Sequence, residues 1–457
     1  MGVAKEEVGS LESSKRRTRA AIYQTVWRWH FYAGLIFSPF LIILAFSGGV
    51  YVFKPQIESV LYKDQYYVQE VGEKSLPYST LVSNVQDEYP DGTIRFVKQY
   101  EEVNRTIEVG LLEDEHMSSV FVDPYSGAIT GSINNEERFT EIFVKLHSEL
   151  IVGGTAANYL VELAACWAII LLITGLYVWW PRNKASVWGT ILPRLRSKGK
   201  TFWRDMHAVP AFWLSIGILL LIMTGLPWSA VLGPQIQKVS VPPEYGYSYG
   251  EKPTSITYTK DVAVDIPWAN ETLPVPSSTV GEYVPLTVDE IHSIAKSSNI
   301  ATPYAVSMPA GKEGVYIISS SYIPNDLATI HVDQYSGAIL SDVRFADFGL
   351  GAKLVETGIA FHEGRLFGLA NQLLGLVICV GLIFIIVSSF VMWRKRKPEG
   401  KLGAPSKSKD KKVTRTVFFI MLVLGIVMPL VGISILVVWL LDFFVLSKVK
   451  QLHQWFN

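Results

Sequence analysis

Five long stretches of the chain contain no charged residue, and each could cross a bilayer as a helix. A hydrocarbon core of roughly 30 Å takes about 20 helical residues. Hydrophobic residues make up 49% of the chain and charged residues 18%, which excludes a disordered chain and is typical of a membrane protein. We therefore predict an α-helical polytopic membrane bundle with five spans. The charge-free stretches are Phe31 to Phe53, Ala164 to Pro181, Ala208 to Gln237, Leu366 to Trp393 and Thr416 to Leu441.

The segments between these stretches differ in charge, which predicts the side of the membrane on which each lies. Residues 1–28, 182–206 and 394–415 carry six, seven and ten Lys and Arg, so they are expected in the cytoplasm. Residues 54–155 hold 18 acidic against 8 basic residues, and 238–365 hold 15 against 8, so both are expected outside. The N-terminus is thus predicted on the cytoplasmic side of the cell membrane and the C-terminus on the outer side.

These boundaries divide the chain into eleven segments. The predicted order is a basic tail (1–28), first span (29–53), first outside domain (54–145), second span (146–181), cytoplasmic loop (182–206), third span (207–237), linker and second outside domain (238–361), fourth span (362–393), basic loop (394–415), fifth span (416–441) and outside tail (442–457).

The sequence contains an internal duplication. A Trp-containing segment ending in His30 opens the first stretch and one ending in His207 opens the third, and each is followed after 17 residues by a hydroxyl residue and a glycine. His147 and His362 likewise precede the second and fourth stretches. A unit of span, outside domain and span therefore occurs twice, with one helix added. The matching segments are Ser47-Gly48 with Thr224-Gly225, Thr174 to Trp179 with Ser389 to Trp393, and Val122 to Ile129 with Val332 to Ile339.

Each outside domain is predicted to be a small α+β domain, with one helix over an antiparallel sheet. Helical spacing occurs at Leu81 to Tyr89 and at Thr287 to Ser298, and Thr287 with Glu290 forms a capping-box pattern. The Pro- and Ser-rich stretch from Val239 to Val284 is expected to be an extended surface connection. Strands are predicted at Thr106 to Leu112, Ser119 to Asp123, Gly314 to Ser319 and Thr329 to Val332, with Tyr-Ser-Gly turns.

Four histidines at span margins form the candidate functional site. Histidine is rare near hydrocarbon, and here it recurs at equivalent places in both copies of the duplication. Two histidines on facing helices provide the axial ligands of six-coordinate haem iron. We predict that His30 pairs with His207 and His147 with His362, which gives two haems at different depths. Zinc or copper is the alternative metal, but the closely spaced ligand motifs that such sites commonly show do not occur.

Further residues could take part in binding these haems. Arg28, Arg204 and Arg365 lie within three residues of a candidate ligand and could bind haem propionates, with Arg365 the better candidate because it is predicted outside. Cys166 and Cys379 are interpreted as small apolar residues within spans, and without a C-x-x-C-H motif any haem must be held by coordination alone. His116, His292, His331 and His453 are interpreted as ordinary residues. Glycines that could let a flat macrocycle approach are Gly34, Gly48, Gly49, Gly175, Gly225, Gly375 and Gly381.

The chain resembles the PepSY-associated transmembrane proteins, iron-regulated membrane proteins that include ferric-siderophore reductases. The resemblance covers roughly residues 20 to 397. It implies PepSY-like outside domains, b-type haem in the bundle, and an oxidoreductase that reduces Fe(III) carried by a siderophore on the outside. It rests on Trp27-Arg-Trp-His30, Asp123-Pro-Tyr-Ser-Gly127, Leu146-His147, Thr174-Gly175, Trp179-Trp-Pro-Arg182, Asp205-Met-His207, Phe361-His-Glu-Gly364 and Met392-Trp393.

The electron donor must lie outside this chain. The predicted cytoplasmic loops are too short for a nucleotide-binding βαβ unit and no G-x-G-x-x-G occurs, so we expect a quinol or a separate cytoplasmic reductase. Membrane lipid and an iron chelate are the other expected partners; equal numbers of basic and acidic residues, 41 each, give no general attraction for nucleic acid. The alternatives are a non-enzymatic, membrane-anchored PepSY protein that binds or regulates peptidases, and a transporter with two repeated halves.

Overall fold

The computed structural model divides the chain into two compact units. It describes residues 2–182, 186–242, 245, 253, 255–279, 284–408, 410–446, 448–449 and 455. The helical unit comprises Met1–Val50, Lys145–Pro234 and Leu374–Asn457, and the sheet unit comprises Tyr51–Val144 and Gln235–Leu373. Each unit therefore takes chain segments from both copies of the duplication.

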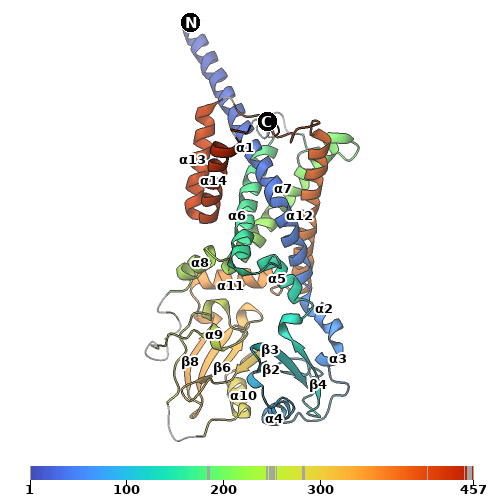
Figure 1. Cartoon of the computed structure of the whole chain (residues 1–457), viewed down its shortest axis with the longest axis vertical. Helices are drawn as coiled ribbons and strands as arrows, with labels where there is room; N and C mark the ends of the chain where they lie inside the picture. The colour runs from blue at the N-terminus through green and yellow to red at the C-terminus, as the bar shows by residue number, and fades with distance from the viewer. Residues whose placement is uncertain are drawn as a thin grey trace. The chain divides into compact units, whose positions relative to one another are not determined.

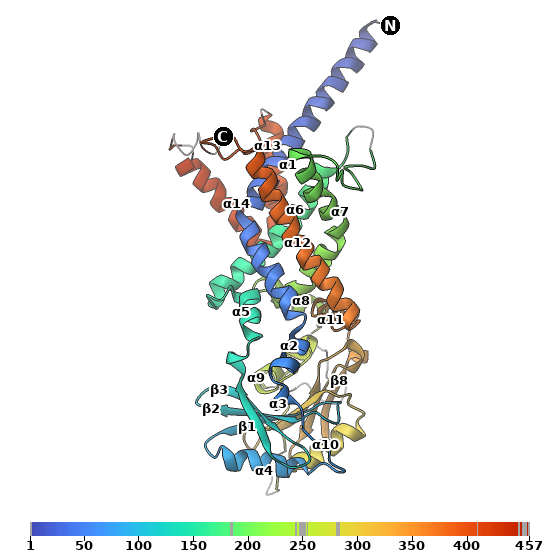
Figure 2. The ribbon, with the colours of Figure 1, turned by 90° about the vertical axis from the view of Figure 1, so that its right-hand side faces the viewer.

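Four helices are long and apolar enough to cross a membrane. They are α1 (Gly2–Tyr51), α6 (Gly154–Trp179), α7 (Gly199–Gly225) and α12 (Leu369–Arg396), and they run side by side in Figures 1 and 2. Apolar side chains on their outer faces, such as Ile36, Trp213 and Val377, are more than half exposed. Apolar surface of this extent is expected against lipid. The helices support a multi-pass membrane protein and account for four of the five predicted spans.

The fifth predicted span, residues 416–441, is not one continuous helix. The chain forms α13 (Lys411–Val427) and α14 (Pro429–Leu441) instead. At 1.5 Å per residue they are about 26 Å and about 20 Å long, shorter than the hydrocarbon core. The helix breaks at Met428, where φ is −123° and ψ is 82°, because a residue before proline avoids the helical conformation and Pro429 has no backbone N–H. The prediction of a fifth span is therefore corrected.

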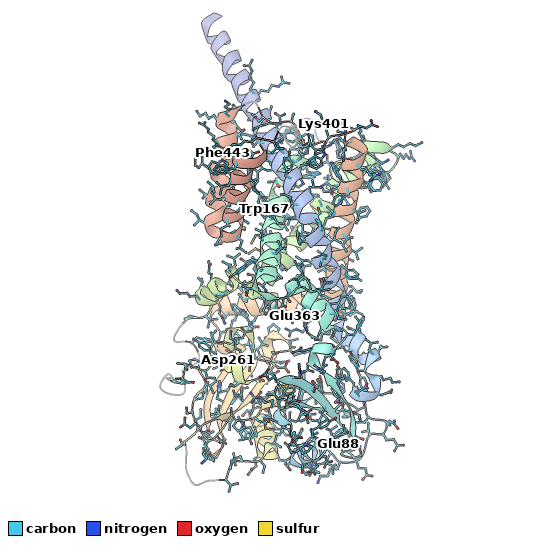
Figure 3. The ribbon with its side chains drawn as sticks, viewed as in Figure 1. Glu88, Trp167, Asp261, Glu363, Lys401 and Phe443 are labelled. Atoms are coloured by element: carbon cyan, nitrogen blue, oxygen red, sulfur yellow. The ribbon has the colours of Figure 1, made fainter. Side chains whose placement is uncertain are left out.

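The two short helices fold back on each other as a hairpin beside α6 (Figure 1). Their closest approach is at two glycines, where a Cβ on Gly425 would lie 2.5 Å from the Cα of Gly432. Trp167 of α6, labelled in Figure 3, donates from Nε1 to Ser434 Oγ of α14 at 3.0 Å. Glycine at both positions is what permits this close approach of the two backbones.

The hairpin returns the C-terminal tail to the side on which the basic loop 394–415 lies. The backbone N–H of Leu402, in that loop, donates to the carbonyl of Trp455 at 3.0 Å. This contact does not agree with a tail on the opposite side of the membrane from that loop. The hydropathy of residues 416–441 correctly indicated an apolar segment, but the proline inside it makes the segment turn back.

Reporter fusions can test this arrangement directly. Green fluorescent protein attached after Asn457 is expected to fluoresce as it does when inserted at Gly400 in the basic loop, because Leu402 of this loop is hydrogen-bonded to Trp455. Alkaline phosphatase at the same two positions is expected to stay inactive. Phosphatase inserted after Asp123, in the sheet unit, serves as the control. Strong phosphatase activity at Asn457 alone would restore the fifth span.

The sheet unit contains one antiparallel sheet of eight strands rather than two separate small sheets. The two copies join where β1 pairs with β5, with Phe96 opposite Ser307 and Gln99 opposite Tyr304. The prediction of two separate outside domains is corrected, because each copy supplies four strands to a continuous sheet. The order is β4-β3-β2-β1-β5-β6-β7-β8, with β1 (Thr93–Gln99), β2 (Ile107–Glu113), β3 (His116–Val122), β4 (Ile129–Asn134), β5 (Tyr304–Ser307), β6 (Val315–Ser320), β7 (Ala328–Asp333) and β8 (Ile339–Arg344).

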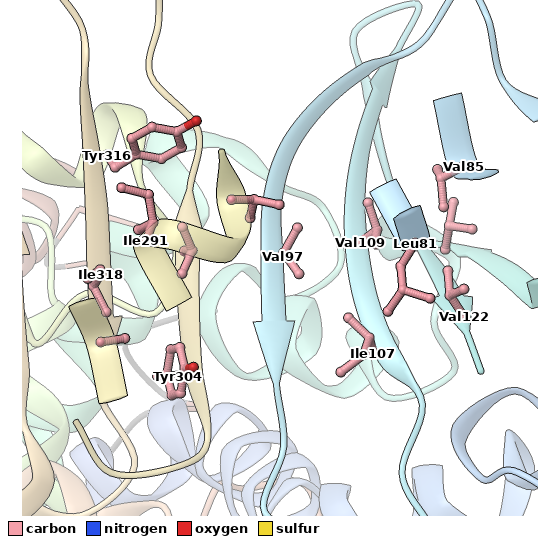
Figure 4. Close-up of a cluster of buried hydrophobic side chains, with 14 of the residues drawn as sticks. Leu81, Val85, Val97, Ile107, Val109, Val122, Ile291, Tyr304, Tyr316 and Ile318 are labelled. Carbon is pink, nitrogen blue, oxygen red and sulfur yellow. The ribbon is translucent and has the colours of Figure 1, made fainter. Parts of the chain in front are cut away.

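Two helices, α4 (Tyr78–Glu88) and α10 (Val288–Ser297), cover one face of this sheet. They correspond to the helices predicted at 81–89 and 287–298. Leu81 and Ile291 are buried against strand residues from both copies, including Val109 and Ile318 (Figure 4). A single hydrophobic core therefore runs across the junction between the copies, and its burial stabilises both together.

The ends of these helices are also capped. The predicted capping box is confirmed at α10, where the N–H of Glu290 donates to Thr287 Oγ1 and the Glu290 carboxylate accepts from the N–H of Thr287. The carboxylate of Asp289, also on α10, accepts the N–H groups of Tyr78 and Ser79 at 2.6 and 3.1 Å. One copy thus satisfies unpaired donors at the start of the other copy's helix.

The duplication is visible in two equivalent turns. Asp123 between β3 and β4, and Asp333 between β7 and β8, each accept a hydrogen bond from the backbone N–H two residues later, at 2.8 and 3.0 Å. The strand pairing shifts just before both turns, at Phe121 and at His331. Aspartate before a Tyr-Ser-Gly turn therefore has the same structural role in both copies.

The connection predicted at 239–284 is not purely a surface segment. Its residues 243–244, 246–252, 254 and 280–283 lie outside the described residues. The described part contains α9 (Thr259–Val262) and the turn η3 (Trp268–Asn270), in which Trp268 and Ala269 are buried against Val343 and Phe348. The tryptophan explains the difference, because a buried indole contributes more apolar area than the surrounding Pro and Ser residues remove.

Short elements complete the two units. They are α2 (Lys54–Leu61), α3 (Lys63–Tyr66), η1 (Asn135–Glu137), α5 (Glu141–Glu149), η2 (Leu226–Trp228), α8 (Leu232–Ser240), η4 (Pro324–Asp326), η5 (Phe345–Asp347), α11 (Leu350–His362) and η6 (Asp442–Leu446).

A buried carboxylate joins α11 to η3 and makes the sheet unit sensitive to pH. Glu356 is only 4% exposed, and its Oε1 accepts the N–H of Ala269 at 2.8 Å. Burial raises the pKa of Glu356 to about 7, although the hydrogen bond from Ala269 and the charge of Arg365 act in the opposite direction. The folded chain therefore favours the protonated carboxyl, whose stabilising contribution is complete below the unfolded pKa of about 4.5 and is lost as pH rises through about 7.

Replacement of Glu356 by glutamine is expected to remove most of this pH dependence. The shift corresponds to an order-of-magnitude contribution of about 3 kcal/mol. The apparent melting temperature of the full protein in detergent, measured between pH 5 and 8, should fall more steeply with pH in the wild type than in Glu356→Gln. Glu88→Gln, at an exposed position labelled in Figure 3, should leave the slope unchanged. Equal slopes for wild type and Glu356→Gln would contradict the assignment.

Candidate functional site

The four histidines predicted as ligands are divided between the two units. His30 on α1, His207 on α7 and His147 on α5 belong to the helical unit, whereas His362 ends α11 in the sheet unit. His147 does not lie on the span helix itself, because α5 ends at Glu149 and the chain turns before α6 begins. The pairing of His147 with His362 would join the two units, and it stays a prediction.

His30 and His207 face each other inside the helical unit. The centres of the two imidazole rings lie 6.4 Å apart, and the ring planes are inclined by 66°. The rings come from the first and third spans, at the positions that the duplication matches. The structure therefore brings together one of the two predicted pairs.

Hydrogen bonds fix which nitrogen of each ring carries the proton. His207 Nδ1 lies 2.9 Å from the carbonyl oxygen of Ile385, which can only accept, so Nδ1 is the donor when the ring is neutral. His30 Nδ1 lies 3.0 Å from Thr174 Oγ1, whose own hydroxyl donates to Ile170 O at 2.6 Å. In both neutral rings Nε2 is consequently the nitrogen with a free lone pair, the form that binds metals.

A glycine beside each hydroxyl residue makes room for an imidazole. A Cβ on Gly175 would lie 3.1 Å from His30 Cε1, and one on Gly48 would lie 3.0 Å from His147 Cε1. His147 Nδ1 also lies 3.0 Å from the hydroxyl of Ser47. The same hydroxyl-glycine pair therefore occurs at both rings: α6 contacts the His30 ring of α1, and α1 contacts the His147 ring of α5. These two glycines were predicted to face a macrocycle, whereas here they contact the histidine rings.

His30 and His207 line a cavity of about 900 Å³ within the helical unit. The volume is within the range of pockets that enclose small molecules and cofactors. Part of its lining is apolar and includes Leu41, Ile218 and Leu382. The other residues with aromatic or charged side chains that line it are Tyr23, Trp27, Phe31, Trp179, Arg182, Trp188, Arg194, Lys200, Arg204, Phe212, Phe390, Trp393 and Arg396.

The three arginines predicted to bind propionates are each engaged elsewhere. Arg28 donates to the carbonyl of Pro405 at 2.7 Å and does not line the cavity. Arg204 lines it but forms an ion pair at 2.7 Å with the fully buried Asp205. Arg365 lies in the sheet unit, where it pairs with Glu363 and donates to the carbonyl of Ser321. Arg28 and Arg204 are therefore not placed by their contacts to serve a ligand of this cavity, whereas the role of Arg365 at the outer haem, near His362, stays a prediction.

The remaining histidines lie in the sheet unit or outside the described residues. His116 is exposed at the start of β3. His292 stacks on Tyr78 with ring centres 3.6 Å apart, and burial lowers its pKa to about 4. His331 is buried on β7, 3.2 Å from the hydroxyl of Thr259. His453 lies outside the described residues. The described contacts of these sheet-unit histidines are those of packed or surface residues.

The sequence analysis missed the partners that orient the ligands. Thr174 and Ser47 were identified as members of the repeat but not as partners of a histidine. Arg182 and Arg396 were not predicted to contact a haem. The signal for the first two was present, since a hydroxyl residue followed by glycine recurs at matched positions. The direction in which each side chain points, however, depends on which helices pack together.

The chemistry available to the site follows from its two nitrogen donors. Among the described residues no group of three or more His, Cys, Asp or Glu side chains gathers as a metal site. A metal held by His30 and His207 would therefore need further ligands of its own. A metalloporphyrin supplies four in-plane nitrogens and takes axial imidazoles, so the donor set matches it.

Comparison with known proteins gives one family match. The model of a family described as the PepSY-associated TM region matches residues 27–396, which is most of the chain. No curated protein matches the sequence.

Proposed function

The chain belongs to the PepSY-associated TM family, and on this premise we propose that it is a membrane di-haem electron-transfer protein. In this proposal it reduces ferric iron, carried by a siderophore, with electrons from a quinol or a separate cytoplasmic donor. It would act in the cell membrane, with the basic loops in the cytoplasm and the sheet unit outside. The observation that carries the proposal is the facing pair His30 and His207 in a cavity.

The residues present fit a haem at this pair. One metal atom fits between ring centres 6.4 Å apart with imidazole–metal bonds of about 2 Å. No hydrogen bond to Nε2 of either ring occurs among the described residues, while both Nδ1 atoms are engaged. Part of the cavity lining is apolar and part is basic, which suits a macrocycle with two carboxylates.

Each residue of the site has a separate task in this proposal. His30 and His207 would hold the haem iron, and a haem bound there would supply one-electron redox chemistry. Thr174 and the Ile385 carbonyl hold the two rings in the metal-binding tautomer. Apolar side chains such as Leu41 exclude water from part of the cavity, which lowers the local polarity and so influences the redox potential.

The second site would use His147 and His362. Its support is the duplication, together with a hydroxyl-glycine pair that holds His147 as Thr174 and Gly175 hold His30. Two sites from two copies would give electrons a stepwise route through the bilayer. Reduction releases iron because Fe(II) binds hard oxygen chelators far less strongly than Fe(III) does.

An absorption spectrum of the protein, expressed with ample haem supply and purified in detergent, tests the proposal. We expect a reducible Soret band with sharp α and β bands, and two haems per chain by pyridine haemochrome. Oxidation of the reduced protein by a ferric siderophore in a stopped-flow instrument then tests the acceptor. A folded but colourless protein would remove the reductase and favour the non-enzymatic binding or regulatory alternative.

A further inference from the structure

The basic end of the cavity contains two kinds of cation. Arg194 and Arg204 share one carboxylate partner, because both form ion pairs with Asp205 at 2.8 and 2.7 Å. Arg182 and Arg396 also line the cavity, and neither has a carboxylate partner among the described residues. The cavity therefore presents two guanidinium groups, together with the ammonium group of Lys200, that have no carboxylate partner among the described residues.

Arg396, the last residue of α12, is positioned by aromatic rings. Its guanidinium carbon lies 5.0 Å from the ring centre of Trp27 and 5.6 Å from that of Phe31. One Nη donates weakly to the carbonyl of Gly403 at 3.3 Å, while Nε is buried and has no hydrogen-bond partner. A buried donor left unpaired is rare in folded proteins and indicates a missing acceptor.

Arg182 is held in a similar way at the end of α6. Its guanidinium carbon lies 3.7 Å from the ring centre of Tyr23 and 5.3 Å from that of Tyr177. Its described hydrogen bond is a long one, 3.4 Å to the carbonyl of Tyr177. Stacking fixes the plane of the guanidinium without using its edge, so most of its donors stay available.

Both arginines lie at the end of the bundle that carries Tyr23, about two helical turns along α1 from His30. A guanidinium binds a carboxylate with two parallel hydrogen bonds, and such charge-assisted pairs are the strong ones. We propose that Arg182 and Arg396 bind the two carboxylate side chains of the haem held by His30 and His207. This inference rests on the proposed function and replaces Arg28 and Arg204 in that role.

Haem transfer to apomyoglobin tests the proposal on the full protein in nanodiscs. Release from two haems gives two kinetic phases. The phase that belongs to the His30–His207 haem is identified as the one that is missing in His207→Ala. Each of Arg182→Gln and Arg396→Gln is expected to accelerate this phase about 10-fold, the effect of losing one charge-assisted hydrogen-bonded pair. The low-spin spectrum should be retained, because both imidazoles remain. Arg28→Gln removes a cation from the same part of the protein without touching the cavity, and release should stay as in wild type.

Haem dimethyl ester, in which both carboxylates are blocked, provides the matched probe. Wild type and the two arginine variants should release the ester at equal rates if carboxylate binding is the cause. Unchanged release of ordinary haem by both variants would overturn the proposal while leaving the proposed function intact. Equal acceleration with haem and its ester would overturn it as well. A wild type without haem would remove the proposed function together with this inference.

Discussion

Replacing either His30 or His207 with alanine is expected to remove the same haem from the purified protein. The two rings face each other at 6.4 Å, so in the proposed site each variant would lack one of the two imidazoles that hold the same iron. The pyridine haemochrome value should fall from two haems per chain to about one, and the double variant should lose no more than either single one. The redox titration of each variant should lack the same component. His147→Ala and His362→Ala should both remove the other component.

Matched variants separate ligand loss from general damage. His116→Ala changes an exposed histidine of the sheet unit and should keep both haems. His207→Gly leaves space for a free imidazole, and added imidazole should restore the low-spin spectrum of the lost site. Loss of different haems from His30→Ala and His207→Ala would reject the pairing, and full haem content in both would reject these ligands.

The sequence predicted the parts of the fold that depend on local composition. Four spans, the helices at α4 and α10, and the capping box at Thr287 all follow from residues close together in the chain. Strands β1 and β5 were missed, although Thr93 to Gln99 has the alternation typical of a half-buried strand. Their pairing depends on a partner about 200 residues away, and no local pattern specifies it.

The fifth span illustrates a different limit. The mean hydropathy of residues 416–441 does not depend on the order of the residues in the segment. The continuity of a helix, in contrast, can be broken where one residue lacks a backbone N–H. Pro429 removes that donor and forces Met428 out of the helical conformation. Giving the proline more weight than the average would have predicted the hairpin. The proline in α1, Pro39, by contrast, does not interrupt its helix, so the residue alone does not decide the outcome.

The candidate site was predictable in its residue types but not in its contacts. The duplication identified His30 and His207 as equivalent, and the structure brings them together. Arg28 and Arg204 were predicted as haem contacts because they lie near the histidines in sequence. Closeness in sequence did not predict which arginines are free to bind a ligand of the cavity, since both form contacts elsewhere. The buried Asp205, which is adjacent to Arg204 in sequence, forms an ion pair with it. Arg182 and Arg396 line the cavity because the ends of α6 and α12 pack near each other, which the sequence does not specify.

Substitution of Gly175 by alanine is expected to weaken the haem held by His30 without weakening the helix. A Cβ at this position would lie 3.1 Å from His30 Cε1, closer than an ordinary contact, so the imidazole must move. Crowding of this kind costs about 1–3 kcal/mol, which corresponds to an affinity loss of about 5- to 150-fold. Haem occupancy and release at the His30 site, and the position of its α band, are the measurements.

Neighbouring glycines supply the controls that give this experiment its meaning. Alanine is a better helix former than glycine by about 1 kcal/mol, so loss of haem from Gly175→Ala cannot be attributed to a weaker helix. Gly48→Ala crowds His147 instead, with a Cβ 3.0 Å from its Cε1, and should disturb only the other haem. Gly49→Ala meets Cys379 Cβ at an ordinary 3.4 Å and should disturb neither. If Gly175→Ala behaves like Gly49→Ala, the glycine does not seat His30, and the contact between α6 and the His30 ring has no functional role.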